Sequence, residues 1–288
     1  MALERLTQGI GLLVALAAAL ACSKSESSTR ENPVVKGLTV VKVAGSTAVL
    51  PLVTDAANRY MAGHAGVVVE VEGGGSRLGM ARVAEGGVTI GTSDINAPPD
   101  AHLEDHKIAV VGFAAMANSG PFNASITSIT MDQLRGVLSG RIKNWSELGG
   151  TSQPIVFVNR AKNSGTRGAV GALVLGGDDF GPAAEEQESS ALVQTRLREK
   201  VGAFSYLALS YRHDALKVFA IDGVEPTPEA IEKGTYPIWS YEHMFTRMPA
   251  TEGARSFIDF FLSPPIQQTL VPSQGFIPIA SMKTSRAQ

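Results

Sequence analysis

The sequence predicts an α/β protein in which helices cover a parallel sheet. Three observations predict it: short β-branched runs alternate with helical patterns, small polar loops follow these runs, and the alternation resumes in the second half of the chain. A βαβαβ order is typical of a parallel sheet with helices on its faces. The length of 288 residues allows two modest domains or one large one.

The first half of the chain supplies the βαβαβ order. Strands are predicted at 38–44, 67–71 and 88–91, and helices at 49–62 and 77–84. Each strand ends in a loop of glycine and hydroxyl residues. Open α/β sheets bind ligands at the carboxyl ends of their strands, so we expect a ligand at this edge.

A long apolar run at 108–116 comes before the second half of the chain. The pattern of that second half predicts another α/β unit. Helix starts are expected at 131–138 and 144–148, and a strand at 154–158 leads to Arg160. The later segments read as strands at 203–207, 216–220 and 239–248, followed by amphipathic helices at 253–262 and 266–270.

Four loops carry groups that suit a small oxyanion. They lie at 45–47, 73–76, 92–94 and 160–167, and the last one directly precedes an apolar helical run. A helix start presents unpaired N–H groups and the positive end of the dipole, which together bind anions. Four such loops in one chain predict a site that holds a small anion with hydroxyls and amides.

The longest of these loops contains two arginines. The fork of Arg160 fits a phosphate group or a carboxylate such as Asp94, although a solvated charge at a strand end is the plain alternative. Arg167 lies on a first helical turn, where the dipole disfavours a cation, so an anion or an acidic side chain is expected nearby. Ser164, Gly165 and Thr166 fit either an anion loop or an ordinary helix N-cap.

Asp94 narrows the choice of anion. A carboxylate among anion-binding groups is unfavourable unless it accepts a hydrogen bond from a protonated ligand. Monohydrogen phosphate carries such a proton and sulfate does not, so Asp94 should reject sulfate. The alternative is that Asp94 only caps the following turn.

Composition and the lack of certain motifs argue against several other classes of protein. The net charge of −2 gives no indication of a large polyanion such as nucleic acid as a partner. The single cysteine cannot form an internal disulfide, and the histidines are far apart, so no metal-ligand spacing is present. The P-loop, G-x-S-x-G and HExxH motifs are absent from the sequence. We expect neither an enzyme nor a bound metal or cofactor.

The first residues predict export. Residues 10–21 form an apolar run that is too short to span a bilayer and follows Arg5, as in a secretory signal. The run ends at Cys22 in a sequence that resembles a bacterial lipobox, which implies a signal peptide at 1–21 and lipid on Cys22. A plain secretory signal is the alternative. The polar, serine-rich stretch 22–36 is expected to be a flexible tether.

Most of the chain from 38 to 279 resembles the periplasmic-type phosphate-binding proteins, the substrate receptors of phosphate ABC transporters. The most specific matches are AGST (44–47), VEGGGS (71–76), IGTSD (90–94), KNWSELG (143–149), VNRAKNSGTR (158–167) and IDGVEPTP (221–228). The resemblance implies a two-lobed periplasmic binding protein fold of type II with the ligand in the cleft. Lobe 1 would comprise 37–116 plus 238–288, and lobe 2 would comprise 117–237.

The resemblance also implies a set of phosphate-binding residues. They are Ser46, Thr47, Ala48 (through its backbone N–H), Ser76, Asp94, Arg160, Ser164, Gly165 and Thr166. The implied function is binding of inorganic phosphate outside the cytoplasmic membrane, as a monomer anchored by lipid, with delivery to the permease of an ABC transporter. A receptor for arsenate or sulfate, or a sensory or adhesive lipoprotein that keeps the fold, is the alternative.

Overall fold

The computed structural model describes residues 37–286. The predicted signal peptide, the lipidation site Cys22 and the tether lie outside the described residues. Residues Gly37–Gln288 form one compact unit. No helix among the described residues is long and apolar enough to cross a membrane.

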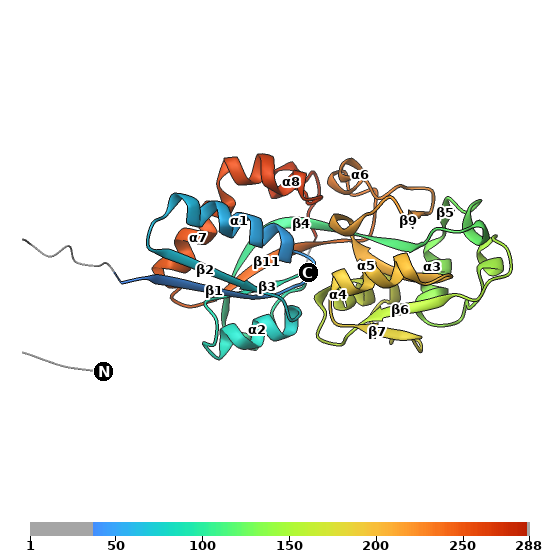
Figure 1. Cartoon of the computed structure of the whole chain (residues 1–288), viewed down its shortest axis with the longest axis horizontal. Coiled ribbons are helices and arrows are strands. Elements are labelled where there is room, and N and C mark those ends of the chain that lie inside the picture. Colours follow the sequence, from blue (N-terminus) through green and yellow to red (C-terminus); the bar gives the residue numbers. More distant parts are fainter. Residues whose placement is uncertain (1–36, 287–288) are drawn as a thin grey trace, which may run out of the picture. The chain divides into compact units, whose positions relative to one another are not determined.

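Helices and strands alternate along the described chain (Figure 1). The strands are β1 (Thr39–Gly45), β2 (Val67–Glu72), β3 (Ile90–Ser93), β4 (Leu103–Asn118), β5 (Ser128–Ile129), β6 (Val156–Arg160), β7 (Glu185–Gln187), β8 (Ala203–Ala208), β9 (Leu216–Val218), β10 (Ala220–Ile221) and β11 (Trp239–Arg247). The α-helices are α1 (Leu50–Gly63), α2 (Ser76–Ala84), α3 (Met131–Leu138), α4 (Gly165–Leu175), α5 (Ser190–Glu199), α6 (Pro228–Glu232), α7 (Glu252–Leu262) and α8 (Val271–Ser273).

Short helical turns complete the structure. The 3-10 turns are η1 (Pro99–Ala101), η2 (Pro121–Asn123), η3 (Trp145–Leu148), η4 (Leu209–Tyr211) and η6 (Ile279–Ser281), and η5 (Ile266–Leu270) is a π-helical turn.

One sheet runs through both halves of the unit, in the order β2-β1-β3-β11-β4-β8-β6-β7, with β9 also paired to β4. Strand β4 joins the halves, because residues 103–112 pair with β11 and residues 113–117 pair with β8. Figure 1 shows β4 running from the half with β1, β2 and β3 into the half with β6 and β7. The chain returns through the segment before β11. These crossings connect two α/β halves.

The pairing is parallel at both ends of the sheet and antiparallel in its middle. Strand β1 pairs in parallel with β2 and β3, and β6 does so with β7 and β8. Strand β11 is antiparallel to both β3 and β4. The predicted α/β class is confirmed, and the antiparallel middle was not predicted.

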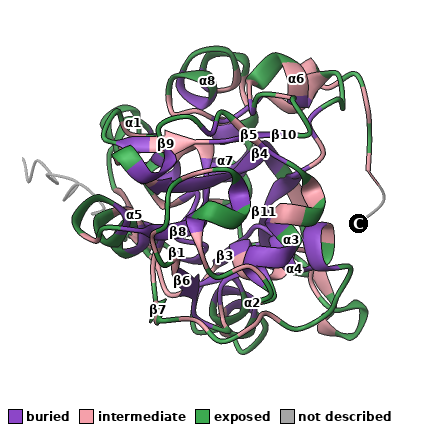
Figure 2. Ribbon diagram, turned by 90° about the vertical axis from the view of Figure 1, so that its right-hand side faces the viewer, coloured by how far each residue is buried: buried purple, intermediate pink, exposed green. Residues whose placement is uncertain are grey.

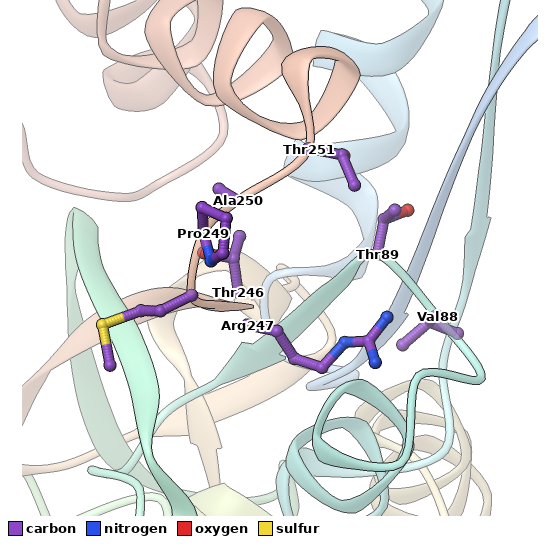
Figure 3. A pocket seen from close by; sticks show the side chains of 8 residues that line it. Val88, Thr89, Thr246, Arg247, Pro249, Ala250 and Thr251 are labelled. Atoms are coloured by element: carbon purple, nitrogen blue, oxygen red, sulfur yellow. The ribbon is translucent and has the colours of Figure 1, made fainter.

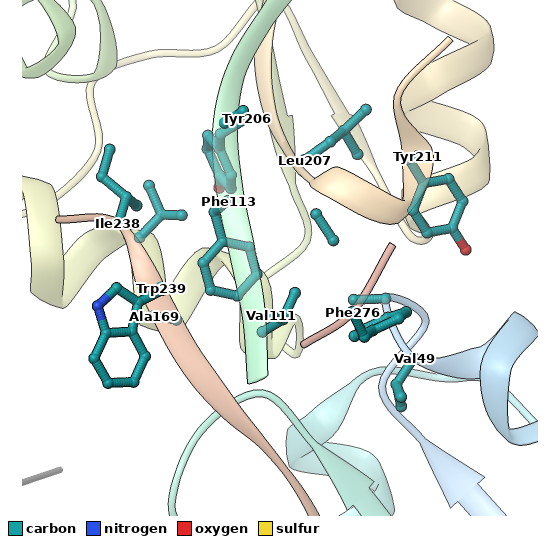
Figure 4. Packing of buried hydrophobic residues seen from close by; sticks show 14 of the residues in the cluster. Val49, Val111, Phe113, Ala169, Tyr206, Leu207, Tyr211, Ile238, Trp239 and Phe276 are labelled. Atoms are coloured by element: carbon teal, nitrogen blue, oxygen red, sulfur yellow. The ribbon is translucent and has the colours of Figure 1, made fainter. Parts of the chain in front are cut away.

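The core follows the central strands. Residues 108–117 of β4 are buried without interruption, as expected of a strand that is covered on both faces. In Figure 2 buried residues gather along β4, β8 and β11. Figure 4 shows Val111 and Phe113 of β4 among cluster members from both halves, including Val49 and Leu207. The apolar segment 108–117 therefore packs against side chains from both halves.

Some predicted elements differ in detail from the structure. The segment 144–148 forms only the turn η3, and 266–270 is π-helical and continues into α8. The predicted strand 216–220 is divided into β9 and β10, which pair with different strands. These differences arise because strand partners and the pitch of a short turn depend on tertiary contacts, which local sequence does not contain. The predicted lobe boundaries stay a prediction.

Candidate functional site

The strands bring three of the predicted loops to one edge of the sheet. In the parallel pairing of β1 with β3, Gly45 lies opposite Thr92. The chain leaves β1, β2 and β3 in the same direction, so the loops at 45–47, 73–76 and 92–94 are neighbours. The loop after β6 comes from the other half and meets them through the hydrogen bonds described below.

The first cluster joins Arg160 to two hydroxyl residues. Its Nη1 donates to Ser190 Oγ at 2.9 Å, and its Nη2 donates to Thr47 Oγ1 at 2.9 Å. The backbone N–H of Ser190 also donates to Thr47 Oγ1 at 3.2 Å. Tyr211 donates its hydroxyl to the carbonyl oxygen of Thr47 at 2.7 Å. The guanidinium of the second half is thus held against the first loop of the other half.

The charge of Arg160 is buried without a counter-charge in contact. Its side chain is 1% exposed, and no carboxylate among the described residues forms an ion pair with it. Its Nε has no hydrogen-bond partner within residues 37–286. Burial lowers the pKa of the guanidinium from its ordinary value, and the nearby charge of Asp94 opposes this change. A buried, uncompensated cation is costly alone and strongly favours an anion beside it.

The second cluster is built around Asp94, which is completely buried. Thr166 donates its hydroxyl to Asp94 Oδ2 at 2.5 Å, and Ser76 donates more weakly to Oδ1 at 3.4 Å. The N–H of Asp94 donates to Ser76 Oγ at 3.1 Å. The turn after β3 is capped by another residue, because Ser93 Oγ accepts from the N–H of Ile95 at 3.1 Å. Asp94 is therefore free of the capping role that was its alternative interpretation.

Gly165 lies close to the loops of the other half. A Cβ atom on Gly165 would lie 2.0 Å from Ser76 Oγ and 3.2 Å from the Cβ of Asp94. No side chain fits there, so glycine lets the start of α4 reach the loops of the other half. The lack of space for a side chain explains why residue 165 is glycine.

Asn163 forms further hydrogen bonds between the two halves. Its side-chain amide donates to the carbonyl of Gly74 at 2.7 Å, and its own carbonyl accepts from the N–H of Arg77 at 3.2 Å. Gly75, beside them, has a φ of 92°, and a Cβ there would lie 2.7 Å from the Asn163 carbonyl oxygen. The glycine-rich loop is thus shaped to receive the loop after β6.

Ser164 and Ser46 have local partners. Ser164 is the N-cap of α4 and accepts from the N–H of Arg167 at 3.2 Å. Ser46 Oγ accepts from the N–H of Ala48 at 3.0 Å, which is the group predicted to contact a ligand. Their roles toward a ligand stay predictions. A hydroxyl residue at a helix start or turn suits both a local cap and a ligand contact, so these hydrogen bonds do not distinguish the two roles.

Arg167 has the acidic neighbour that its position predicts. Its Nη1 contacts Glu186 Oε1 at 2.7 Å and donates to the carbonyl of Arg160 at 2.6 Å. The guanidinium also lies over the ring of Phe180, 5.2 Å from its centroid. Arg167 therefore supports the strand that carries Arg160.

Sequence reasoning missed Ser190, Tyr211 and Glu242. Ser190 is the first residue of α5, and a Ser-Ser pair at a helix start was its only signal in the sequence. Tyr211 and Glu242 lie in segments without a recognisable motif, and only the fold brings them to Thr47 and Asp94. Burial raises the pKa of Tyr211 to about 12, with smaller effects from Arg160, Asp94 and Glu242.

A surface cavity of about 240 Å³ lies away from these clusters. It is lined by residues 88–89 and 246–251 and has Arg247 as its only charged lining residue (Figure 3). Residues 88–89 precede β3, whereas Asp94 follows it, so the cavity lies beyond the opposite end of that strand. None of the predicted site residues lines it.

Comparisons with known proteins agree with this architecture. Residues 23–265 match the profile of the PBP superfamily domain. The chain is 38% identical to the phosphate-binding protein PstS of Bacillus subtilis over 92% of this chain and 88% of that one. It is 25% identical to the phosphate-binding protein PstS of Borreliella burgdorferi, over 83% and 90% of the two chains.

Solved structures give the same result. A crystal structure with bound phosphate, described as a phosphate ABC transporter substrate-binding protein from Clostridium perfringens, superposes with a TM-score of 0.79. The identity is 29%, over 84% of this chain and 100% of that one. An ABC-type phosphate transport receptor from Vibrio cholerae is 25% identical, with a TM-score of 0.68 over 82% and 99% of the chains.

The fold and its paired loops define a PBP-superfamily binding protein with two lobes, as the resemblance implied. The chain belongs, within that superfamily, to the family of the phosphate-binding protein PstS.

Proposed function

We propose that the protein binds one inorganic phosphate between its lobes and delivers it to the permease of an ABC transporter. The observation that carries this proposal is that the same set of loops holds two buried charged residues. Arg160 has no ion-pair partner among the described residues, and Asp94 is a buried carboxylate. The cation and the hydroxyl groups would donate hydrogen bonds to the phosphate oxygens. The carboxylate would accept a hydrogen bond from the protonated oxygen of the phosphate.

The two lobes share the hydrogen-bonding groups. Thr47, Ser76 and Asp94 follow β1, β2 and β3 in one half of the unit. Arg160 is the last residue of β6, and Thr166 lies in the first turn of α4, both in the other half. A ligand bound by both sets favours the closed arrangement, because only that arrangement makes all of the contacts. Closure is the change that a permease can recognise.

Relatives support the transport role. The similar proteins are phosphate-binding proteins and phosphate transport receptors by name. The proposed place of action is outside the cytoplasmic membrane, with Cys22 as the site of lipid attachment and the protein acting as a monomeric receptor rather than an enzyme. A Cys22→Ser protein that still partitions into membranes would contradict the anchor.

Calorimetric titration of residues 37–288 with phosphate tests the function. The protein is first unfolded, dialysed and refolded, because tightly bound ligand can survive purification. We expect one phosphate per chain, with the same affinity in the presence of excess sulfate. Refolded protein that binds no phosphate would exclude the proposed function.

The same titration separates the alternative anions. Arsenate has the shape and the proton of phosphate, so the physical argument predicts that it competes. Sulfate lacks the proton and leaves Asp94 facing an acceptor, so it should not compete. Competition by sulfate at an affinity similar to phosphate would remove the role given to Asp94.

A further inference from the structure

Glu242 is a buried carboxyl group that the proposed phosphate contacts do not use. It lies on β11, it is completely buried, and neither of its carboxyl oxygens has a hydrogen-bond partner among the described residues. An ionised carboxylate left without donors in the protein interior is strongly unfavourable. The carboxyl group of Glu242 is therefore stable here only if it is protonated or if other groups donate hydrogen bonds to it.

The strand register places Glu242 beside Asp94. His243 pairs with Ser93 in the antiparallel β11–β3 ladder, so the preceding residue of β11 lies next to the residue that follows Ser93. Ser240 of the same strand donates its hydroxyl to the carbonyl of Asp94 at 2.8 Å. The register against β4 shifts between Glu242 and His243. Such bulges re-aim side chains near functional sites.

The groups that act on Glu242 include a second acid, Asp94. Asp94 faces it from the loop after β3, Tyr211 faces it from η4, and Arg160 acts on both of these neighbours. Its partner on β4 is Ala109, and the adjacent His243 contacts Asp105 at 2.7 Å. Burial, followed by the charge of Asp94, raises the pKa of Glu242 well above its ordinary value.

Two facing carboxylates cannot hydrogen-bond to each other, but one proton between them makes an O–H···O⁻ bond. We propose that Glu242 is protonated and donates to the carboxylate of Asp94, as a positioning residue for phosphate. Asp94 then accepts from Thr166, Ser76, Glu242 and the phosphate proton, which matches its roughly four acceptor positions. The pair carries one negative charge, so it repels an anionic ligand less than two carboxylates would.

Infrared spectroscopy tests the protonation without any ligand. The difference spectrum between the wild-type protein and Glu242→Gln at neutral pH should contain the C=O stretch of a protonated carboxyl group. A difference spectrum with only carboxylate bands would overturn the proposal. This measurement is independent of phosphate binding, although the positioning role rests on the proposed function.

Phosphate titration of two variants tests the positioning role. Gln keeps a neutral donor toward Asp94, whereas Met has similar volume and no donor. We expect Glu242→Gln to bind phosphate at least tenfold more tightly than Glu242→Met, since a hydrogen bond to a charged group is worth about 1.5–3 kcal/mol, or roughly 10-fold or more. Thermal melts and circular dichroism establish that both variants fold.

Equal affinities in these two variants would show that the donor does not position Asp94. A wild-type protein that binds no phosphate would instead overturn the proposed function, and the infrared result would still decide the protonation of Glu242.

Discussion

Gly165 faces Ser76 across the two lobes with no room for a side chain between them. A Cβ on Gly165 would lie 2.0 Å from Ser76 Oγ, while the neighbouring Thr166 donates to Asp94 Oδ2 at 2.5 Å. The start of α4 therefore reaches the loops of the other lobe only because its first residue is glycine.

Replacing Gly165 with alanine should weaken phosphate binding. The added methyl group must displace Ser76 or hold the lobes apart, and overpacking of this kind costs about 1–3 kcal/mol, which corresponds to about 5- to 150-fold in affinity. The matched control is Gly168→Ala on the same helix, where a Cβ would meet Ile95 at an ordinary 3.4 Å. Calorimetry on both variants checks this, and equal affinities would contradict the role of Gly165 in closure.

Arg160→Lys should bind phosphate less tightly than the wild-type protein. Lysine keeps the charge but cannot donate to Ser190 and Thr47 with a rigid fork while it also faces a ligand. Loss of one charged hydrogen bond corresponds to about 1.5–3 kcal/mol. The control is the same change at Arg59, an exposed arginine of α1. If Arg160→Lys bound phosphate as tightly as Arg59→Lys, the guanidinium would not belong to the site.

The predicted strands and anion loops of the first half agree with the structure because their signals are local. Runs of β-branched residues define β1 and β2, and glycine and hydroxyl residues mark the loops that follow them. Parallel pairing then places these loops at one edge without further information. The candidate residues Thr47, Ser76 and Asp94 could therefore be brought together from sequence.

Other features depend on contacts that are distant in sequence. Strand β7 consists of Glu185, Glu186 and Gln187, which lack β propensity and form a strand only because β6 offers a free edge. Ser190 meets Thr47 across 143 residues. Such pairings depend on how the two halves approach each other, which neither periodicity nor a motif expresses.

Asp94→Asn should reduce the discrimination between phosphate and sulfate. The asparagine amide can donate to a sulfate oxygen, whereas Asp94 can only accept, so the variant loses the repulsion that excludes a fully deprotonated anion. The change in relative affinity should be about 10-fold or more, because hydrogen bonds to charged groups contribute about 1.5–3 kcal/mol. Competition titrations with both anions measure it. Complete exclusion of sulfate by the variant would show that other groups set the selectivity.

The protonated state of Glu242 also predicts how stability depends on pH. Burial raises the pKa of this carboxyl well above its ordinary value of 4.5, so the folded state retains a proton that the unfolded state releases. Stability linked to this proton is fully present below pH 4.5 and is lost as the pH rises toward the folded-state pKa. The slope in that window is about 1.4 kcal/mol per pH unit.

Urea unfolding of the ligand-free protein at several pH values checks this dependence. The free energy of unfolding of the wild-type protein should fall relative to that of Glu242→Gln as the pH rises above 4.5, because glutamine has no proton to lose. Glu225→Gln is the matched control, since Glu225 is exposed. Its difference from the wild-type protein should stay nearly constant with pH. Parallel curves for the wild-type protein and Glu242→Gln would mean that Glu242 is ionised in the folded protein and cannot donate to Asp94.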